Sequence, residues 1–137
     1  MTDVLIADND RAVSGLLTEI LVRAGLSPVH AYDGHTAGIM ARQPGLRVIV
    51  CDLDMPRVSG LEVLESLRDL PNPPRAVVVS GYLDADVRER LGKLPFVRHV
   101  LSKPFDLQSF AERVQQLVAE AAVTLPPPDV AGSAGCQ

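Results

Sequence analysis

Three strand-like segments of this chain each end in a side chain that can take part in chemistry. One apolar run, Val48–Cys51, ends in Asp52. Another, Val4–Ala7, ends in Asp8, and a third run is followed by Lys103. In open α/β sheets, ligands bind beyond the carboxyl ends of the strands. Two carboxylates and an ammonium group at that edge predict a site for a phosphate group and a divalent cation.

The chemistry that suits these side chains is phosphoryl transfer to a carboxylate. Such a transfer needs an acceptor at a fixed point, a divalent cation, and donors for the remaining phosphate oxygens. Asp8, Asp52 and the main chain just after Asp52 can supply oxygens to Mg²⁺, which often uses only one or two carboxylates. Lys103 can act as a point charge on the phosphate, and the Ser80 hydroxyl, at another strand end, can donate a hydrogen bond.

The elements that must position these residues alternate between strand and helix five times along the chain. Apolar, β-branched runs predict the strands, and apolar residues at helical spacing predict the helices. Strands are expected at 4–7, 29–32, 47–52, 75–80 and 97–101, and helices at about 10–24, 34–42, 59–70, 84–92 and 106–122. Ser59 and Glu62 form a capping-box pattern at one helix start. Short connections between alternating elements imply a parallel sheet with helices on both faces.

The composition fits one globular domain. The chain has 137 residues, of which 47% are hydrophobic, and a net charge of −4, which argues against direct nucleic-acid binding. No apolar run approaches the roughly 18 residues of a membrane span, and no signal-peptide pattern opens the sequence. Cys51 and Cys136 form no disulfide framework, so we expect a cytoplasmic protein. We also expect the domain to cover 1–122, with a disordered tail or linker over 123–137.

Four segments, in order and at the ends of successive predicted strands, resemble receiver domains of the two-component response regulator family. The segments are Val4–Asp10, Asp52–Pro56 with Ser59 and Gly60, Val77–Gly81, and Leu101–Phe105. The resemblance covers about Thr2 to Ala122. It implies a flavodoxin-like sheet of five parallel strands in the order 2-1-3-4-5.

The resemblance also implies a role for each site residue. Asp52 would be the phosphoacceptor, Lys103 the lysine that contacts the phosphate, and Ser80 the hydroxyl that switches position. Asp8 and Asn9 occupy the positions of the family's acidic pair, which helps to bind Mg²⁺ or Mn²⁺. The main-chain carbonyl of the residue two after the phosphoacceptor would complete the metal site. That residue is Asp54.

The partners implied by the resemblance are a sensor histidine kinase or a phosphotransfer protein. The phosphorylated domain would signal through the surface of its fourth helix, fifth strand and fifth helix, to a protein target that the sequence does not identify. A homodimer is left open, and neither nucleic acid nor a membrane is expected as a direct partner. The domain would catalyse only its own phosphorylation and dephosphorylation. A cis Lys103–Pro104 bond is implied as well.

The sequence departs from the family pattern at two positions. Asn9 replaces an acid, so the metal site loses one negative charge and we expect weaker Mg²⁺ binding. The adjacent Asp10 is expected to cap the following helix instead of substituting as a ligand. Val100 stands where the family often has an aromatic residue that turns inward on activation. His99 beside it is expected to face the opposite side of the sheet.

Other functions remain as alternatives. A pseudo-receiver that acts as an interaction module without phosphorylation is favoured by Asn9 and Val100. Asp52 and Asp54 also resemble the Asp-x-Asp of haloacid-dehalogenase-type phosphatases, but here the pattern lies mid-chain and the length leaves no room for a cap domain. A dinucleotide-binding unit is not supported, because no glycine-rich loop follows the first predicted strand.

Overall fold

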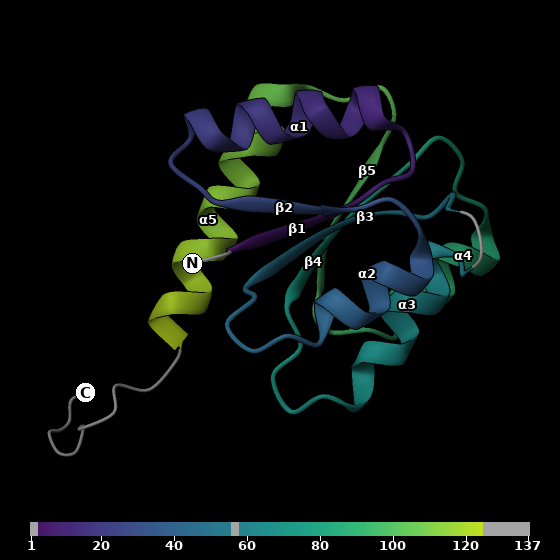
Figure 1. The fold of residues 1–137 in the computed structure, drawn as a ribbon. Helices are drawn as coiled ribbons and strands as arrows, with labels where there is room; N and C mark the ends of the chain where they lie inside the picture. Colours follow the sequence, from purple (N-terminus) through teal and green to yellow (C-terminus); the bar gives the residue numbers. More distant parts are fainter. Residues whose placement is uncertain (1–2, 56–57, 125–137) are drawn as a thin grey trace, which may run out of the picture.

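The computed structural model describes residues 3–55 and 58–124. Its five strands form one parallel sheet in the order β2-β1-β3-β4-β5, which confirms the predicted topology (Figure 1). The strands are β1 (Val4–Ala7), β2 (Pro28–Ala31), β3 (Val48–Asp52), β4 (Arg75–Ser80) and β5 (Val97–Ser102). The helices are α1 (Arg11–Arg23), α2 (Gly34–Ala41), α3 (Gly60–Ser66), the 3-10 turn η1 (Leu67–Asp69), α4 (Ala85–Gly92) and α5 (Leu107–Thr124).

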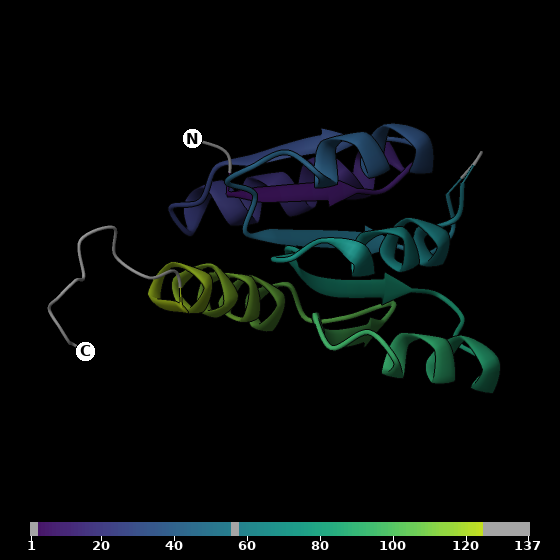
Figure 2. The same cartoon turned by 90° about the horizontal axis from the view of Figure 1, so that it is seen from below.

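The helices cover both faces of the sheet, as predicted. α1 and α5 pack against each other on one face, and α2, α3 and α4 lie on the other (Figures 1 and 2). The side chains of β1 alternate between the two layers. Val4 and Ile6 pack with α1 and α5, whereas Leu5 and Ala7 pack with α2 and α3.

The central strands explain why the candidate residues meet at one edge. Every residue of β1 and β3 is buried, and only Arg75 in β4 is not. A strand buried on both faces needs a continuous apolar run, which is the pattern that these three segments have. Because the strands are parallel, the polar residues that end them lie side by side at the carboxyl edge.

Side-chain caps fix where the helices begin. Asp10 accepts hydrogen bonds from the main-chain N–H groups of Ala12 and Val13, so it caps α1 as predicted. Ser59 and Glu62 form the predicted capping box of α3, and Asp84 caps α4. These caps satisfy N–H groups that no helical carbonyl reaches, and they hold the helix starts at the carboxyl edge.

The structure differs from the sequence prediction mainly at element ends. The helix predicted to run to residue 70 ends at Ser66 and continues as the turn η1. The Ser66 hydroxyl donates to Val63 O at 2.6 Å, a local bond that competes with regular helix. α5 runs to Thr124, and residues 125–137 of the predicted tail lie outside the described residues. No helix in the described ranges is long and apolar enough to span a membrane.

Candidate functional site

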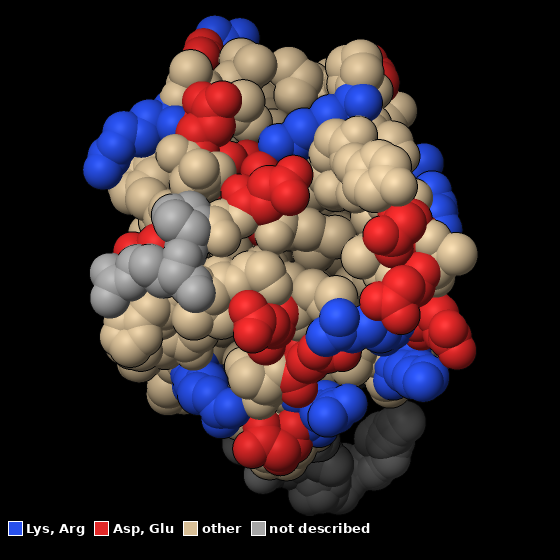
Figure 3. All heavy atoms as spheres, turned by 90° about the vertical axis from the view of Figure 1, so that its right-hand side faces the viewer, with Lys and Arg blue, Asp and Glu red and all other residues tan. Residues whose placement is uncertain are grey.

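Four polar side chains lie where β1, β3, β4 and β5 end. Asp8 is 1% exposed, Asp52 is 3% exposed and Ser80 is 1% exposed, while Lys103 is partly buried. Figure 3 looks onto this edge, where Asp and Glu side chains gather near the centre of the face. Buried polar side chains at a strand edge need partners, so their contacts decide what the site can do.

Two hydrogen bonds fix the carboxylate of Asp52. Its Oδ1 accepts from the main-chain N–H of Asp54 at 2.9 Å, and its Oδ2 accepts from Lys103 Nζ at 2.9 Å. β3, which carries Asp52, is paired with β1 on one side and β4 on the other. The result is a carboxylate with fixed oxygen positions, which is what the acceptor in a group transfer requires.

One oxygen of Asp8 lacks a hydrogen-bond donor. Oδ1 accepts from the main-chain N–H of Asp10 at 2.9 Å, but the buried Oδ2 accepts from no residue in the described part of the chain. Lys103 Nζ lies 3.9 Å from Oδ2, beyond hydrogen-bond distance. Burial, and then the charge of Asp52, raise the pKa of Asp8 to about 6. The site therefore holds more negative charge than Lys103 offsets.

The raised pKa of Asp8 predicts that the metal-free protein becomes less stable as the pH rises. The folded state binds the Asp8 proton more tightly than the unfolded state, whose ordinary value is 3.8. The contribution of Asp8 to stability is therefore complete below about pH 4 and falls as the pH rises through 6. Relative to Asp8→Asn, the unfolding free energy should drop by about 2 kcal/mol between pH 4 and pH 6. Urea denaturation of both proteins from pH 4 to 7 measures this, and a constant difference would contradict it.

The Ser80 hydroxyl is engaged with the loop after β4. It donates to the main-chain carbonyl of Tyr82 at 2.8 Å and accepts from the N–H of Tyr82 at 3.1 Å. To donate to a phosphate oxygen, the hydroxyl must leave the Tyr82 carbonyl, since it has a single proton. The sequence did not predict the role of Tyr82, because any residue at this position has the main-chain groups that form these hydrogen bonds.

Lys103 joins the end of β5 to the rest of the site. Its main-chain N–H donates to Ser80 O at 2.9 Å, and the Lys103–Pro104 bond is cis, as the resemblance implies. Burial acts to lower the pKa of Lys103, but the hydrogen bond and charge of Asp52, with the charge of Asp8, raise it overall. The ammonium group therefore stays positive at neutral pH.

Comparison with known proteins decides the family. The profile of the response regulator receiver domain matches residues 4–115, most of the chain. This chain belongs to the response regulator receiver family. That family is regulatory and is not a class of enzymes, so the receiver assignment is favoured over the phosphatase alternative.

Relatives of this receiver domain include both whole regulators and single domains. The transcriptional regulatory protein CpxR of Escherichia coli (strain K12) is 25% identical over 86% of this chain and 50% of its own length. The chain thus spans about half of such relatives. Sporulation initiation phosphotransferase F of Bacillus subtilis (strain 168) is 22% identical over 82% of this chain and 90% of its own length. The receiver domain of the Francisella response regulator 1452 has a TM-score of 0.78 and 25% identity, over 88% of this chain and 98% of that one.

Receiver domains generally bind Mg²⁺ at their phosphorylation site, and the residues present here suit such an ion. No group of three His, Cys, Asp or Glu side chains in the described ranges forms a metal site. Mg²⁺ is nevertheless often bound by only one or two carboxylates, and Asp8 and Asp52 supply two that are buried. The unsatisfied Oδ2 of Asp8 is the atom that fits a cation best. Asn9 and Asp54 are exposed at the rim, and Asp10 is engaged as a helix cap.

Val100, which stands where the family often has an aromatic residue, lies in β5 of this receiver. Val100 is 38% exposed and pairs with Val78, whose side chain packs on the layer of α2, α3 and α4. His99 lies on the other side, where its Nδ1 is 3.2 Å from Arg113 Nη1 on α5. The predicted opposite orientation of the two side chains is therefore confirmed. Burial, and then the charge of Arg113, lower the pKa of His99.

Gly60 allows α3 to start directly against the carboxyl edge of the sheet. A Cβ at Gly60 would lie 2.2 Å from the main-chain oxygen of Asp52 and 2.8 Å from Leu53 Cα. Gly60→Ala should therefore lower the unfolding free energy by about 1–3 kcal/mol through overpacking. Gly15→Ala is the matched control, because a Cβ there meets nothing within 4 Å and should stabilise α1 by about 0.5–1 kcal/mol. Urea denaturation compares the two, and equal stabilities would contradict the close approach.

Proposed function

We propose that Asp52 of this receiver domain accepts a phosphoryl group from a phosphohistidine of a sensor kinase or a phosphotransfer protein. The observation that supports this most is the carboxylate of Asp52, fixed at the end of β3 with Lys103 Nζ 2.9 Å from its Oδ2. Receiver domains interact with histidine kinases or phosphotransfer proteins, so the donor class follows from the family.

Asp8, Asn9, Asp52 and the main-chain carbonyl of Asp54 would hold the Mg²⁺ or Mn²⁺ ion. The bound cation would offset the negative charge of the carboxylates and of the incoming phosphate. The unpartnered Oδ2 of Asp8 supports this assignment, because a buried carboxylate oxygen without a donor is costly to maintain. Asn9 contributes an amide oxygen without charge, so this site is weaker than one with a third carboxylate.

The transfer itself is an in-line displacement at phosphorus. A carboxylate oxygen of Asp52 forms the new P–O bond while the P–N bond to the donor imidazole breaks, and the imidazole leaves with the electron pair of that bond. The ammonium group of Lys103 moves from Asp52 Oδ2 to the phosphoryl oxygens, where its positive charge offsets their negative charge. Ser80 then exchanges the carbonyl of Tyr82 for a phosphoryl oxygen, which releases the loop after β4.

The released loop links the site to an output surface formed by α4, β5 and α5. Tyr82, in this loop, is 75% exposed, and Val100 on β5 is 38% exposed. Because Val100 is smaller than the aromatic residue often found there, we propose that the loop carries more of the conformational signal than the β5 side chain does. This surface then binds a downstream protein.

Asn9→Asp should strengthen Mg²⁺ binding by about tenfold, because it restores a negative charge beside the cation. Asn72→Asp is the matched control: it adds the same charge in the loop before β4, at the opposite edge of the sheet. Calorimetric titration of both variants with MgCl₂ checks this. Equal affinities for the wild type and Asn9→Asp would contradict the placement of residue 9 at the metal.

The function is tested by incubating the protein with acetyl phosphate and Mg²⁺ and measuring its intact mass. We expect the addition of one phosphoryl group, and none when EDTA removes the metal. If acetyl phosphate, beryllofluoride and a panel of phosphorylated histidine kinases all left the protein unmodified, the phosphorylation-independent pseudo-receiver would be the better description.

A further inference from the structure

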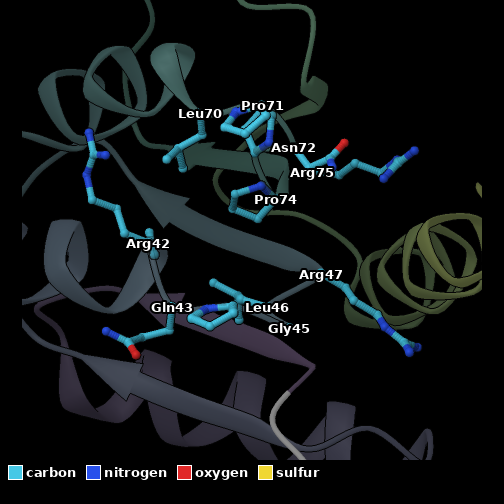
Figure 4. A pocket seen from close by; sticks show the side chains of 13 residues that line it. Arg42, Gln43, Gly45, Leu46, Arg47, Leu70, Pro71, Asn72, Pro74 and Arg75 are labelled. Atoms are coloured by element: carbon cyan, nitrogen blue, oxygen red, sulfur yellow. The ribbon is translucent and has the colours of Figure 1, made fainter. Parts of the chain in front are cut away.

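A hollow of about 470 Å³ lies at the edge of the sheet opposite to the phosphorylation site, where β3 and β4 begin. It is enclosed between residues 41–47, which connect α2 to β3, and residues 70–75, which connect η1 to β4 (Figure 4). A second hollow of about 380 Å³ shares Leu70, Asn72, Pro73 and Arg75 with the first. The two hollows therefore adjoin each other along residues 70–75.

The charge around these hollows is mainly positive, although Asp69 and Glu120 pair with three of the lining arginines. Among the described residues that line them there is no Asp or Glu, although the chain has 17 acidic and 13 basic residues. The basic residues that line them are Arg42, Arg47, Arg68, Arg75 and Arg98. A concave surface lined by arginines attracts anions, even on a protein whose net charge is −4.

The arginines differ in how firmly they are held. Arg42 donates to Ser66 O at 2.6 Å and pairs with Asp69. Arg75 and Arg98 both pair with Glu120. Arg47 and Arg68 form no ion pair with any residue that the structure describes.

Arginine side chains start at the rim of the first hollow on two sides. In Figure 4 Arg47 and Arg75 extend separately away from the hollow on the side of α5, and Arg42 points away from it on the opposite side. Arg47 and Arg75 are adjacent because Arg75 N–H donates to Arg47 O at 3.0 Å across the starts of β3 and β4. To contact a ligand in the hollow, these guanidinium groups would turn inward from the rim.

The walls between the arginines are apolar and stiff. Leu46 and Leu70 face each other across the hollow, and Pro71 and Pro74 line the side next to Leu70 (Figure 4). Proline fixes the backbone angle φ, so this wall changes little when a ligand binds. The amide of Asn72 adds hydrogen-bond donors and an acceptor.

We propose that the joined hollows bind a small phosphorylated ligand that carries a planar ring, the chemistry of a nucleotide. Their volumes fall within the range of about 300–1,000 Å³ of small-molecule sites. Arginine binds phosphate in two-point contacts and stacks on planar rings, and the leucine and proline walls contact the faces of such a ring. This site is independent of Asp52 and of the proposed phosphorylation.

Isothermal titration calorimetry of the full chain with ADP and with inorganic pyrophosphate tests this site. We expect saturable binding of ADP at one site, tighter than that of pyrophosphate, because only ADP has a ring for the apolar walls. Arg47→Ala should weaken ADP binding by about tenfold or more, since it removes a charged donor. Arg88→Ala removes an exposed arginine of α4 and should leave the affinity unchanged, as should Asp52→Ala.

Three results would overturn the proposal. The first is the absence of saturable ADP binding at millimolar concentration, and the second is an equal loss of affinity in Arg47→Ala and Arg88→Ala. The third is tighter binding of a thymidine oligonucleotide than of ADP, which would indicate a nucleic-acid surface. Thermal unfolding of each variant checks that the fold is kept, and Arg68→Ala provides a second variant if Arg47→Ala is unstable.

Discussion

Asp52→Ala is expected to abolish phosphorylation by acetyl phosphate, with no phosphoryl group detectable by intact mass. The substitution removes the only carboxylate that accepts from both Lys103 and a main-chain N–H at this edge, among the described residues. It should leave the fold intact. The charge of Asp52 is one cause of the raised pKa of Asp8, so the metal-free variant should be at least as stable as the wild type at pH 7.

Asp54→Ala is the matched control for this substitution. Asp54 is exposed, and its contact with Asp52 is made by a main-chain N–H that alanine keeps. The control should therefore accept one phosphoryl group. If Asp54→Ala lost phosphorylation while Asp52→Ala kept it, the assignment of the acceptor would be wrong.

Lys103→Ala is expected to slow phosphorylation by about a hundredfold at saturating Mg²⁺. The ammonium group contacts Asp52 directly, and loss of one such electrostatic contact typically costs this much. Removing it also leaves the carboxylates of Asp8 and Asp52 without an ion-pair partner among the residues that the structure describes. The metal-free variant should therefore lose about 2 kcal/mol of stability, part of which Mg²⁺ restores.

Two measurements separate the catalytic effect of Lys103 from a structural one. The rate of phosphoryl addition is followed by intact mass over time, and urea denaturation is run with and without Mg²⁺. Lys93→Ala, which removes an exposed lysine just after α4, should match the wild type in both. A Lys103→Ala rate within twofold of the wild type would contradict the role of this lysine.

The sequence predicted the site because Asp8, Asp52 and Ser80 each follow or end a continuous apolar run. β3 and β4 are continuous apolar runs, so their direction and their last residues, Asp52 and Ser80, could be assigned without knowledge of the tertiary structure. The helix caps Asp10 and Ser59 were equally clear, since a cap depends on a few neighbouring residues. The family resemblance then supplied the strand order, which local patterns do not determine.

Features that depend on distant segments were not predicted. The arginine-lined hollows combine three stretches, 41–47, 68–75 and 95–98, none of which is unusual by itself. The bonds between Ser80 and Tyr82 involve the main chain and leave no trace in the residue type. Gly60 was assigned only as part of the family pattern, and its close approach to Asp52 requires the fold.

The most direct test of the central claim is to locate the phosphoryl group on the chain. Acetyl phosphate and Mg²⁺ are added, the acyl phosphate is reduced with borohydride, and tandem mass spectrometry of the peptides identifies the aspartate converted to homoserine. Our account predicts conversion at residue 52 alone, and none when Mg²⁺ is withheld. Conversion at Asp8, Asp10 or Asp54, with residue 52 unchanged, would contradict it.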